Sequence, residues 1–260
     1  MLPVMAHTHN LVFHGPFVTK TYTSWQRGEH RREWAVLRHL HEFAVDLAPR
    51  PVEATLEARP PAVTMSWVPG QPLDGGLSET HLVAVVDAVT RLWNVPHDNL
   101  TDLTPWTDDL DFGRGLTAGP RPAGGVTAEA FDAALDWWKG PDPDQLRRRP
   151  AVTVLGHRDP NLANYLWDGR RVRMVDFEDA AVSDPATELA VMMEHLSWRG
   201  VDADAVGRRF DVDQGRLLAA RRLWAMFWLW LVLPGGRSAD RNPPGTAEYQ
   251  ARRLLDLLAR

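Results

Sequence analysis

Three oxygen-bearing side chains in the second half of the chain have the types and spacing that phosphoryl transfer requires. Asn164 follows Asp159 by five positions, and Asp176 follows Asn164 by twelve. Phosphoryl transfer needs a carboxylate that receives or orients the proton of the attacking hydroxyl, and oxygen ligands that hold Mg²⁺ against the phosphates. Asp159 suits the first task, and Asn164 and Asp176 suit the second. The pattern therefore indicates a phosphotransferase site with bound Mg²⁺.

The same residues also have a purely structural interpretation. Asp, Pro and Asn together commonly mark ordinary turns, and an Asp and an Asn at this spacing occur often by chance. The neighbouring residues favour the catalytic interpretation. His157 precedes the first aspartate, apolar β-like residues lie on both sides, and Asp176 is followed by Phe177.

The region from Val154 to His195 resembles the catalytic and metal-binding core of the aminoglycoside phosphotransferase family, whose relatives are the choline kinases and protein kinases. The resemblance extends more loosely over most of the chain. The matching residues are Leu155-Gly156-His157-Arg158-Asp159, Asn164, Val175-Asp176-Phe177-Glu178-Asp179, Asp184-Pro185 and Glu188-Leu189-Ala190.

This resemblance implies an α+β, two-lobed protein-kinase-like fold with a small β-rich N-lobe and a larger, mainly helical C-lobe. It implies that Asp159 is the catalytic base and that Asn164 and Asp176 bind magnesium. It also implies that His157 and Asp184 are structural supports of the catalytic loop. The cofactors implied are Mg²⁺ and ATP, with GTP as an alternative nucleotide.

Lys20 is the expected phosphate-binding residue of the first lobe. Only two of the 29 basic residues are lysine, and Lys20 lies on the second of two short predicted strands, 11–14 and 17–22. Kinase-like folds place at this point the lysine that neutralises the α- and β-phosphates. Glu33, on a predicted helix over 29–43, is the expected partner that orients it, with Glu29 as a competing candidate. A solvent-facing lysine and a solvated helix face are the alternatives.

Two departures from the family pattern concern the phosphate end and the substrate. The segment Met5–Asn10 contains no glycine, so a Gly-rich cover over the phosphates is not visible. Arg158 stands where these small-molecule kinases usually have glycine. Protein kinases have arginine there, but residues 178–184 are too few for an activation segment that binds a peptide. A protein substrate is therefore not expected.

The elements that must position these residues follow from the periodicity. Strands are predicted over 52–56 and 62–67, and Pro69-Gly70 then reads as a linker. We expect an N-lobe over 1–68 that binds the nucleotide, with the adenine near Met65, Trp67 and Val68, and a C-lobe over 69–260. In the C-lobe, Ser78 and the Asp184-Pro185 pair are predicted helix starts. Other helices are expected over 127–138, 214–233 and 246–258, strands over 151–155, 165–167 and 172–175, and an exposed loop over 116–126.

Acidic residues gather between Trp106 and Gln145, with eight acids against three bases. The family resemblance implies that this region helps to bind the acceptor. Clustered carboxylates would attract a cationic hydroxylated molecule such as an aminoglycoside, while a solvated surface is the alternative. The candidate acceptor-binding residues are Asp108, Asp109, Asp111, Glu129 and Asp132.

The composition limits the classes of function. The chain has 260 residues, no cysteine and a formal net charge of -5. It lacks the basic excess that nucleic acid or anionic membranes attract, so neither is an expected partner. Without cysteine, a disulfide framework and thiolate zinc sites are excluded. No signal peptide or spanning segment is recognised, so we expect a cytoplasmic protein, either a monomer or a homodimer.

The sequence thus predicts an Mg-ATP-dependent kinase that phosphorylates a hydroxyl of a small molecule. Two alternatives to an antibiotic kinase remain. One is a metabolic kinase that acts on a sugar, amino alcohol or amino acid. The other is a catalytically silent nucleotide-binding pseudokinase, which the glycine-free segment would suit.

Overall fold

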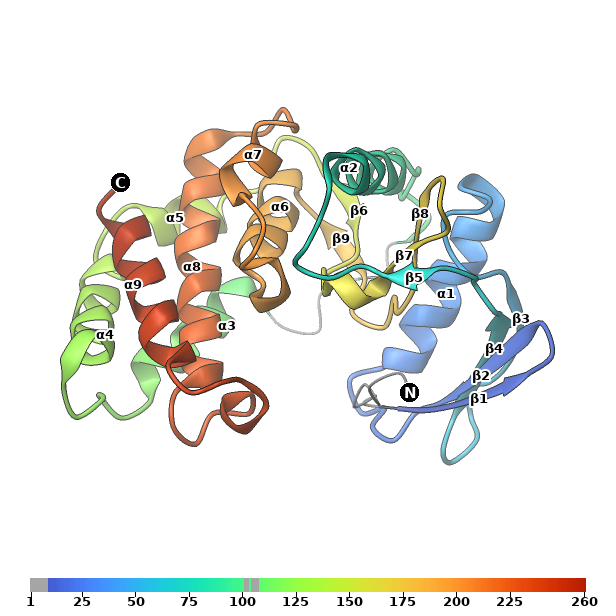
Figure 1. Cartoon of the computed structure of the whole chain (residues 1–260), viewed down its shortest axis with the longest axis horizontal. Coiled ribbons are helices and arrows are strands. Elements are labelled where there is room, and N and C mark those ends of the chain that lie inside the picture. Colours follow the sequence, from blue (N-terminus) through green and yellow to red (C-terminus); the bar gives the residue numbers. More distant parts are fainter. Residues whose placement is uncertain (1–8, 101–102, 104–107) are drawn as a thin grey trace. The chain divides into compact units, whose positions relative to one another are not determined.

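The computed structural model describes residues 9–100, 103 and 108–260, and the chain forms two compact units. The first unit consists of Met1–Trp106 and Val154–Ser183, and the second of Thr107–Thr153 and Asp184–Arg260 (Figure 1). Within the described ranges, the strands belong to the first unit and the second is helical, which confirms the expected α+β class. The expected lobe boundary after residue 68 divides the chain differently and stays a prediction. Residues 5–8 of the glycine-free segment lie outside the described residues.

A four-stranded antiparallel sheet holds Lys20. Gly15, at φ 59°, and Pro16 form the turn between its first two strands. Lys20 lies on an inner strand, opposite Leu11 on one side and Val63 on the other. All four strands were predicted, with ends that differ by one residue. They are β1 (Asn10–His14), β2 (Phe17–Thr21), β3 (Pro51–Thr55) and β4 (Ala62–Ser66), in the order β1-β2-β4-β3.

Helix α1 (Glu29–Phe43) packs against β3 and β4, within the bounds that the sequence predicted. Val36, Leu37 and Leu40 are buried, at the three- and four-residue steps that place side chains on one helix face. Glu33 precedes Val36 and Leu37 by three and four positions and belongs to the same buried face. The helix therefore directs this carboxylate toward the sheet.

Two small sheets position the segments that contain Asp159, Asn164 and Asp176. The segment between β6 and β7 contains Asp159 and Asn164, and the segment between β8 and β9 contains Asp176. Because β7 and β8 form a hairpin, the two segments meet at its base, where the amide of Val175 donates to the carbonyl of Asn164 over 3.0 Å. One sheet has the order β5 (Gln71–Pro72), β7 (Tyr165–Trp167), β8 (Val172–Met174), and the other pairs β6 (Val154–Gly156) with β9 (Ala181–Ser183).

Helix α2 (Glu79–Trp93) contacts β6 and β8 from within the first unit. Ser78 is its N-cap, as predicted. The Ser78 hydroxyl accepts the amide of His81, and the His81 ring accepts the amide of Ser78 in return. These reciprocal bonds satisfy backbone donors that a helix start leaves free.

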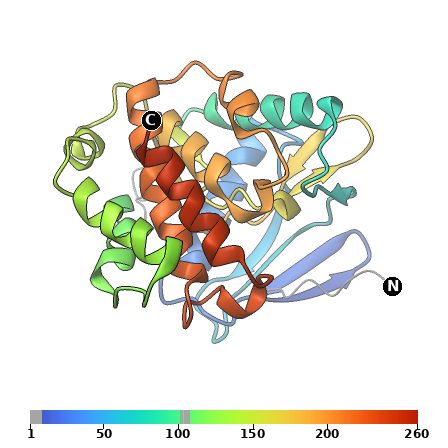
Figure 2. The ribbon, with the colours of Figure 1, turned by 60° about the vertical axis from the view of Figure 1, so that its left-hand side comes forward.

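The second unit is built around helix α8 (Gln214–Val232). Twelve of its nineteen residues are buried, the pattern of a helix that is covered on most sides. Helix α4 (Gly125–Trp137) packs on α9 (Thr246–Leu258), and α7 (Ala203–Gly207) packs on α6 (Figure 2). The helices in contact with α8 are α3 (Asp109–Ala118), α5 (Asp142–Arg147), α6 (Pro185–Glu194) and α9 (Figures 1 and 2).

The loop predicted over 116–126 is wrong at its start, because α3 continues to Ala118. The abundance of Gly and Pro in 116–126 indicated a loop. In the structure, Gly113 and Gly115 within α3 allow close contact with α8. A Cβ atom on Gly115 would lie 2.5 Å from the ring of Trp230. Among the described helices, none combines the length and the apolar character that a membrane crossing requires.

Candidate active site

Lys20 and Glu33 form a buried ion pair, with 2.8 Å between Lys20 Nζ and Glu33 Oε2. Both residues are almost fully buried, at 5% and 1% exposure. The Tyr22 hydroxyl also donates to Glu33 Oε2. Burial by itself would lower the pKa of Lys20, but the nearby carboxylates, Glu33 first, raise it well above its usual value. Lys20 therefore remains cationic.

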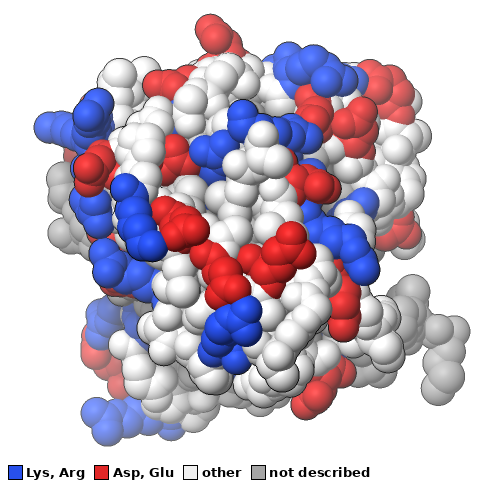
Figure 3. Space-filling model, turned by 90° about the vertical axis from the view of Figure 1, so that its left-hand side faces the viewer, with Lys and Arg blue, Asp and Glu red and all other residues white. Residues whose placement is uncertain are grey.

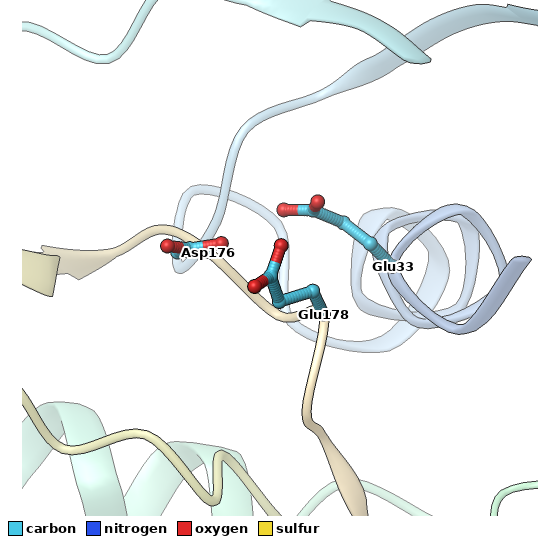
Figure 4. A group of neighbouring side chains, drawn as sticks. All are labelled: Glu33, Asp176 and Glu178. Carbon is cyan, nitrogen blue, oxygen red and sulfur yellow. The ribbon is translucent and has the colours of Figure 1, made fainter. Parts of the chain in front are cut away.

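The Lys20 ammonium also contacts two acids of the segment that follows β8. Its Nζ lies 2.5 Å from Asp176 Oδ1 and 2.7 Å from Glu178 Oε2. Figure 4 shows Glu33, Asp176 and Glu178 directed toward a common space, and one oxygen of each lies within 4.8 Å of the others. Sequence reasoning gave Glu178 no role. Its signal was its place in the same short motif, two residues after Asp176.

His9 is a further member of this cluster that the sequence did not reveal. Its Nε2 lies 2.8 Å from Glu178 Oε2. Burial would raise the pKa of Glu178, but the close contact with His9 and the charge of Lys20 hold it at about 2. Glu178 is therefore ionised at neutral pH. No sequence pattern connects two residues this far apart.

The Lys20 ammonium lies among the three carboxylates of this cluster and contacts each of them. Three carboxylates surround one lysine, so the cluster has negative charge in excess, and carboxylate oxygens are the ligands that Mg²⁺ prefers. Asp176 belongs to this set. Asn164, the other expected magnesium ligand, donates from Nδ2 to Asp159 instead, and its role as a ligand stays a prediction.

Asp159 and Asn164 lie on the loop between β6 and β7. Asn164 Nδ2 is 3.0 Å from Asp159 Oδ2 and 3.1 Å from the backbone oxygen of Asp159. Burial, followed by the negative charges of Asp176 and Asp179, raises the pKa of Asp159 to about 7. The electrostatic effect of Asp176 couples the two motifs. A carboxylate with this pKa can exchange a proton near neutral pH.

His157 lies beneath the Asp176 segment, where a scaffold role was expected. Its Nδ1 accepts the amide of Asp159, so Nε2 bears the proton that is donated to the carbonyl of Val175, over 2.9 Å. Its ring lies 4.6 Å from the ring of Phe177. Burial lowers the pKa of His157. A neutral imidazole thus holds the loop with Asp159 and the segment with Asp176 together through both nitrogens.

Two residues of these motifs have left-handed backbone conformations. Arg158 has φ 67° and Asp176 has φ 69°. Such values are uncommon for residues other than glycine, although Asp tolerates them better than most. Residues held in this way gather at functional sites, where the surrounding structure enforces them. Glycine, the residue expected here from the family resemblance, adopts this conformation without a Cβ clash.

The expected adenine-binding residues continue from β4. Met65 and Val68 are buried, whereas Trp67 is 53% exposed. Trp67 and Val68 line a cavity of about 240 Å³ together with residues at the C-terminal end of α1, and Lys20 and Met65 are not among the lining residues. A role of these three residues in nucleotide binding stays a prediction.

The remaining candidates lie in the second unit. Asp184 caps α6 by accepting the amide of Thr187 over 3.0 Å, and it pairs with Arg216 at 3.1 Å. These contacts fix a helix start, and the expected support of the catalytic loop stays a prediction. Two of the five acceptor candidates form contacts that stabilise the fold. Asp108 caps α3, and Asp132 forms a two-point ion pair with Arg121.

Asp109 and Asp111 lie in the first turn of α3, and Glu129 is exposed on α4. Figure 3 views the face that lies at the left in Figure 1, and basic and acidic side chains alternate there without one large acidic patch. The structure therefore brings Lys20, Glu33 and Asp176 into contact and joins Asn164 to Asp159, while a role of the acceptor candidates stays a prediction.

Comparison with solved structures shows which fold this is. A choline/ethanolamine kinase family protein from Mesorhizobium loti has 16% identity over 98% of this chain and 87% of its own, with a TM-score of 0.70. The choline kinase LicA from Streptococcus pneumoniae has 12% identity over 97% and 89%, with a TM-score of 0.67. The GDP and kanamycin complex of APH(2")-IIia has 19% identity over 98% and 91%, with a TM-score of 0.69. These likenesses confirm the expected kinase-like fold.

Two comparisons with known sequences bear on the family of this chain. A search of curated protein sequences found no match. The model of the APH phosphotransferase enzyme family matches residues 13–227, which include most of the sheet with Lys20, the motifs with Asp159 and Asp176, and most of α8. Because this match covers most of the sequence, the chain belongs to the APH phosphotransferase enzyme family.

Proposed function

We propose that the protein transfers the γ-phosphoryl group of Mg-ATP to a hydroxyl of a small molecule. The observation that supports this most directly is the position of Asp176. Its carboxylate contacts Lys20, which is paired with Glu33, and its charge acts on Asp159. A phosphate-binding lysine, a metal-binding acid and a base are thus coupled within one compact unit, as phosphoryl transfer requires.

Asp159 is the proposed base. Proton transfer is most effective when the pKa of the base lies near the working pH, and the pKa of Asp159 is raised to about 7. The side-chain amide of Asn164 fixes the orientation of the carboxylate. Asp159 would accept the hydroxyl proton of the acceptor, while His157 holds the loop in place.

Lys20 is the proposed partner of the nucleotide phosphates. Glu33 and Tyr22 limit its movement, so its ammonium has little side-chain entropy left to lose when it binds an anion. Asp176 and Asn164 are the proposed magnesium ligands, and Glu178 is an additional candidate. Mg²⁺, when bound, supplies the positive charge that offsets the phosphates.

The acceptor is proposed to be a hydroxylated small molecule. Solved structures with this fold include a choline kinase and an aminoglycoside phosphotransferase in complex with kanamycin. The cap at Asp108 and the ion pair at Asp132 occupy two of the acids that could attract a cation. Antibiotic and metabolic acceptors are therefore both candidates.

The test is a measurement of acceptor-dependent ADP or GDP release with Mg-ATP or Mg-GTP. The panel includes aminoglycosides, choline, sugars and amino acids. For an active acceptor, Asp159→Ala should lower kcat by about 10²–10⁴-fold, the usual contribution of a general base. Asp136→Ala, which removes an exposed acid of α4, is the matched control and should leave the rate unchanged.

Two other outcomes would contradict the proposal. Heat stabilisation by Mg-ATP without turnover of any acceptor would replace the proposal with a silent nucleotide-binding module. Full turnover by Asp159→Ala would show that Asp159 is not the base.

A further inference from the structure

Arg32 of α1 holds the backbone of the segment that follows Asp176. Its Nε donates to the carbonyl oxygen of Glu178 over 2.7 Å, and its Nη2 donates to the carbonyl oxygen of Arg27 over 3.1 Å. These residues all belong to the first unit. One guanidinium therefore connects the turn that precedes α1 with the segment that follows β8.

Arg27 makes a second connection between the same two segments. Its Nη1 donates to Asp179 Oδ1 over 3.1 Å. Glu29 fixes Arg27 in turn, because its two carboxylate oxygens accept the backbone amide and Nε of Arg27, both over 3.0 Å. Glu29, the competing candidate for the partner of Lys20, thus pairs with Arg27.

Glu33 adds a third contact from the start of α1. Its Oε1 accepts the amide of Phe177 over 3.2 Å, while its Oε2 pairs with Lys20. The three residues that follow Asp176 are therefore each bound by a side chain of 27–33. Asp176 has φ 69°, and a conformation of this kind persists only where the surrounding structure enforces it. The three contacts supply that enforcement.

The partners of Arg32 are unusual for a half-buried cation. Burial lowers the pKa of its guanidinium, and a cation that is removed from water is normally paired with an acid. Among the described residues, however, Arg32 donates to two carbonyl oxygens and forms no ion pair. An ion pair with Asp176 or Glu178 would neutralise a carboxylate that faces Lys20. A contact with a carbonyl fixes the backbone and leaves both carboxylates available.

We propose that Arg32, together with Arg27, is a positioning residue of the phosphotransferase site. It sets the conformation of residues 177–179 and so directs the carboxylates of Asp176 and Glu178 toward the cation of a bound Mg-nucleotide. This inference rests on the proposed function, because it assigns these carboxylates a role in binding Mg²⁺.

Removal of Arg32 has two possible effects on Mg²⁺ binding, and they have opposite signs. Loss of a nearby positive charge would strengthen the binding of a cation by Coulomb's law. Loss of the contact that positions the ligands would weaken it, as substitution of residues that orient metal ligands does in other proteins. Weaker Mg²⁺ binding without Arg32 would therefore identify positioning rather than charge as its role.

Calorimetric titration with ADP, once with Mg²⁺ and once with a chelator, measures how much Mg²⁺ increases the affinity for the nucleotide. We expect the unchanged protein to bind ADP more tightly with Mg²⁺. Arg32→Met should reduce this increase by about tenfold or more, while its affinity for ADP without Mg²⁺ should match that of the control variant. Arg32→Lys keeps the charge and a donor and should recover part of the increase.

Arg31→Met is the matched control, because Arg31 is exposed one position earlier on α1 and its loss changes the net charge equally. It should keep the full effect of Mg²⁺. Arg27→Met tests the same inference at an exposed residue, which covers the case that Arg32→Met does not fold. It should reduce the effect of Mg²⁺ in the same direction.

The two proposals fail in different ways. An effect of Mg²⁺ that is unchanged or larger in Arg32→Met and Arg27→Met would overturn the positioning role and leave the proposed function intact. So would a loss of the same size in Arg31→Met. An unchanged protein that binds ADP no more tightly with Mg²⁺ than without it would contradict the proposed function, and the positioning role with it.

Discussion

Arg158 is held in a conformation that costs free energy for any residue with a Cβ atom. At φ 67° a side chain approaches its own backbone, at a cost of about 1–2 kcal/mol relative to the right-handed region. The Arg158 side chain recovers part of this by donating to the Ser183 hydroxyl over 3.3 Å. Any substitution that shortens the side chain loses that bond, so the backbone cost must be measured between two short residues.

Arg158→Gly should therefore be more stable than Arg158→Ala. Both variants lack the contact with Ser183, but only alanine has a Cβ, and we expect a difference of about 1 kcal/mol in the free energy of unfolding. Urea titration of both variants measures it. Equal stability would show that the loop relaxes away from the left-handed conformation once the arginine is gone.

The predicted residues that the structure brings into contact lie within recognisable local patterns. Lys20 was predicted because lysine is rare and because it lies on the second strand of a predicted hairpin, and Glu33 because it lies on the helix that follows. Asp159, Asn164 and Asp176 lie in one short motif. His9 was missed because its contact with Glu178 joins segments 169 positions apart, and no local pattern encodes such a pairing.

At the level of elements, the contact between α3 and α8 depends on two glycines. Gly113 and Gly115 place backbone where a side chain would otherwise stand, against Leu223 and Trp230 of α8. An alanine in a helix is usually more favourable than a glycine, by about 1 kcal/mol. At a tight interface, however, overpacking costs about 1–3 kcal/mol, and the rigid Trp230 ring has little freedom to move away.

Gly115→Ala should consequently lower the free energy of unfolding, despite the better helix propensity of alanine. We expect a net loss of about 1–2 kcal/mol, measured by urea or thermal unfolding. Gly119→Ala is the control, because the nearest atoms to its added Cβ are 3.5 Å away and its φ of -82° suits any residue. If Gly115→Ala is as stable as the control, α3 and α8 are not closely packed at this point.

The helices differ in how well the sequence predicted their positions. The helices with regular apolar spacing or clear start signals, such as α1, α2 and α9, were located almost to the residue. The last residues of helix α3 were predicted as a loop, because the segment 116–126 is rich in Gly and Pro. The helical conformation of α3 is stabilised by its contact with α8, about a hundred residues later in the chain. Local helix propensity contains no information about such a contact.

At the level of the whole molecule, the free energy of unfolding at acid pH reflects buried groups with opposite signs. His195 packs edge-on against Trp228, and its Nδ1 accepts the amide of Ser197. Burial, with a smaller effect of the Arg199 charge, lowers the pKa of His195 to about 3. The unfolded chain therefore takes up this proton first. The contribution of neutral His195 is complete above pH 6.5 and is lost as the pH falls toward 3.

Asp159 changes the free energy of unfolding in the opposite direction over an overlapping pH range. Its folded pKa, raised to about 7, means that the folded protein takes up a proton before the unfolded chain does. Stability from this group is complete below its ordinary pKa and is lost as the pH rises through 7. The total pH dependence of the wild-type protein is thus a partial cancellation, and a single-site variant is needed to resolve it.

His195→Asn should flatten the loss of stability on acidification. Asparagine keeps an acceptor near the position of Nδ1 but does not titrate, so between pH 6 and 5 the free energy of unfolding should fall less steeply, by up to about 1.4 kcal/mol per pH unit. Urea titrations at several pH values, without divalent cations, measure this slope. Asp159 is present in both proteins, so its contribution cancels in the difference. His41→Asn, at an exposed histidine of α1, should leave the slope unchanged. Equal slopes for His195→Asn and the wild type would show that His195 is protonated in the folded protein and that its site tolerates the charge.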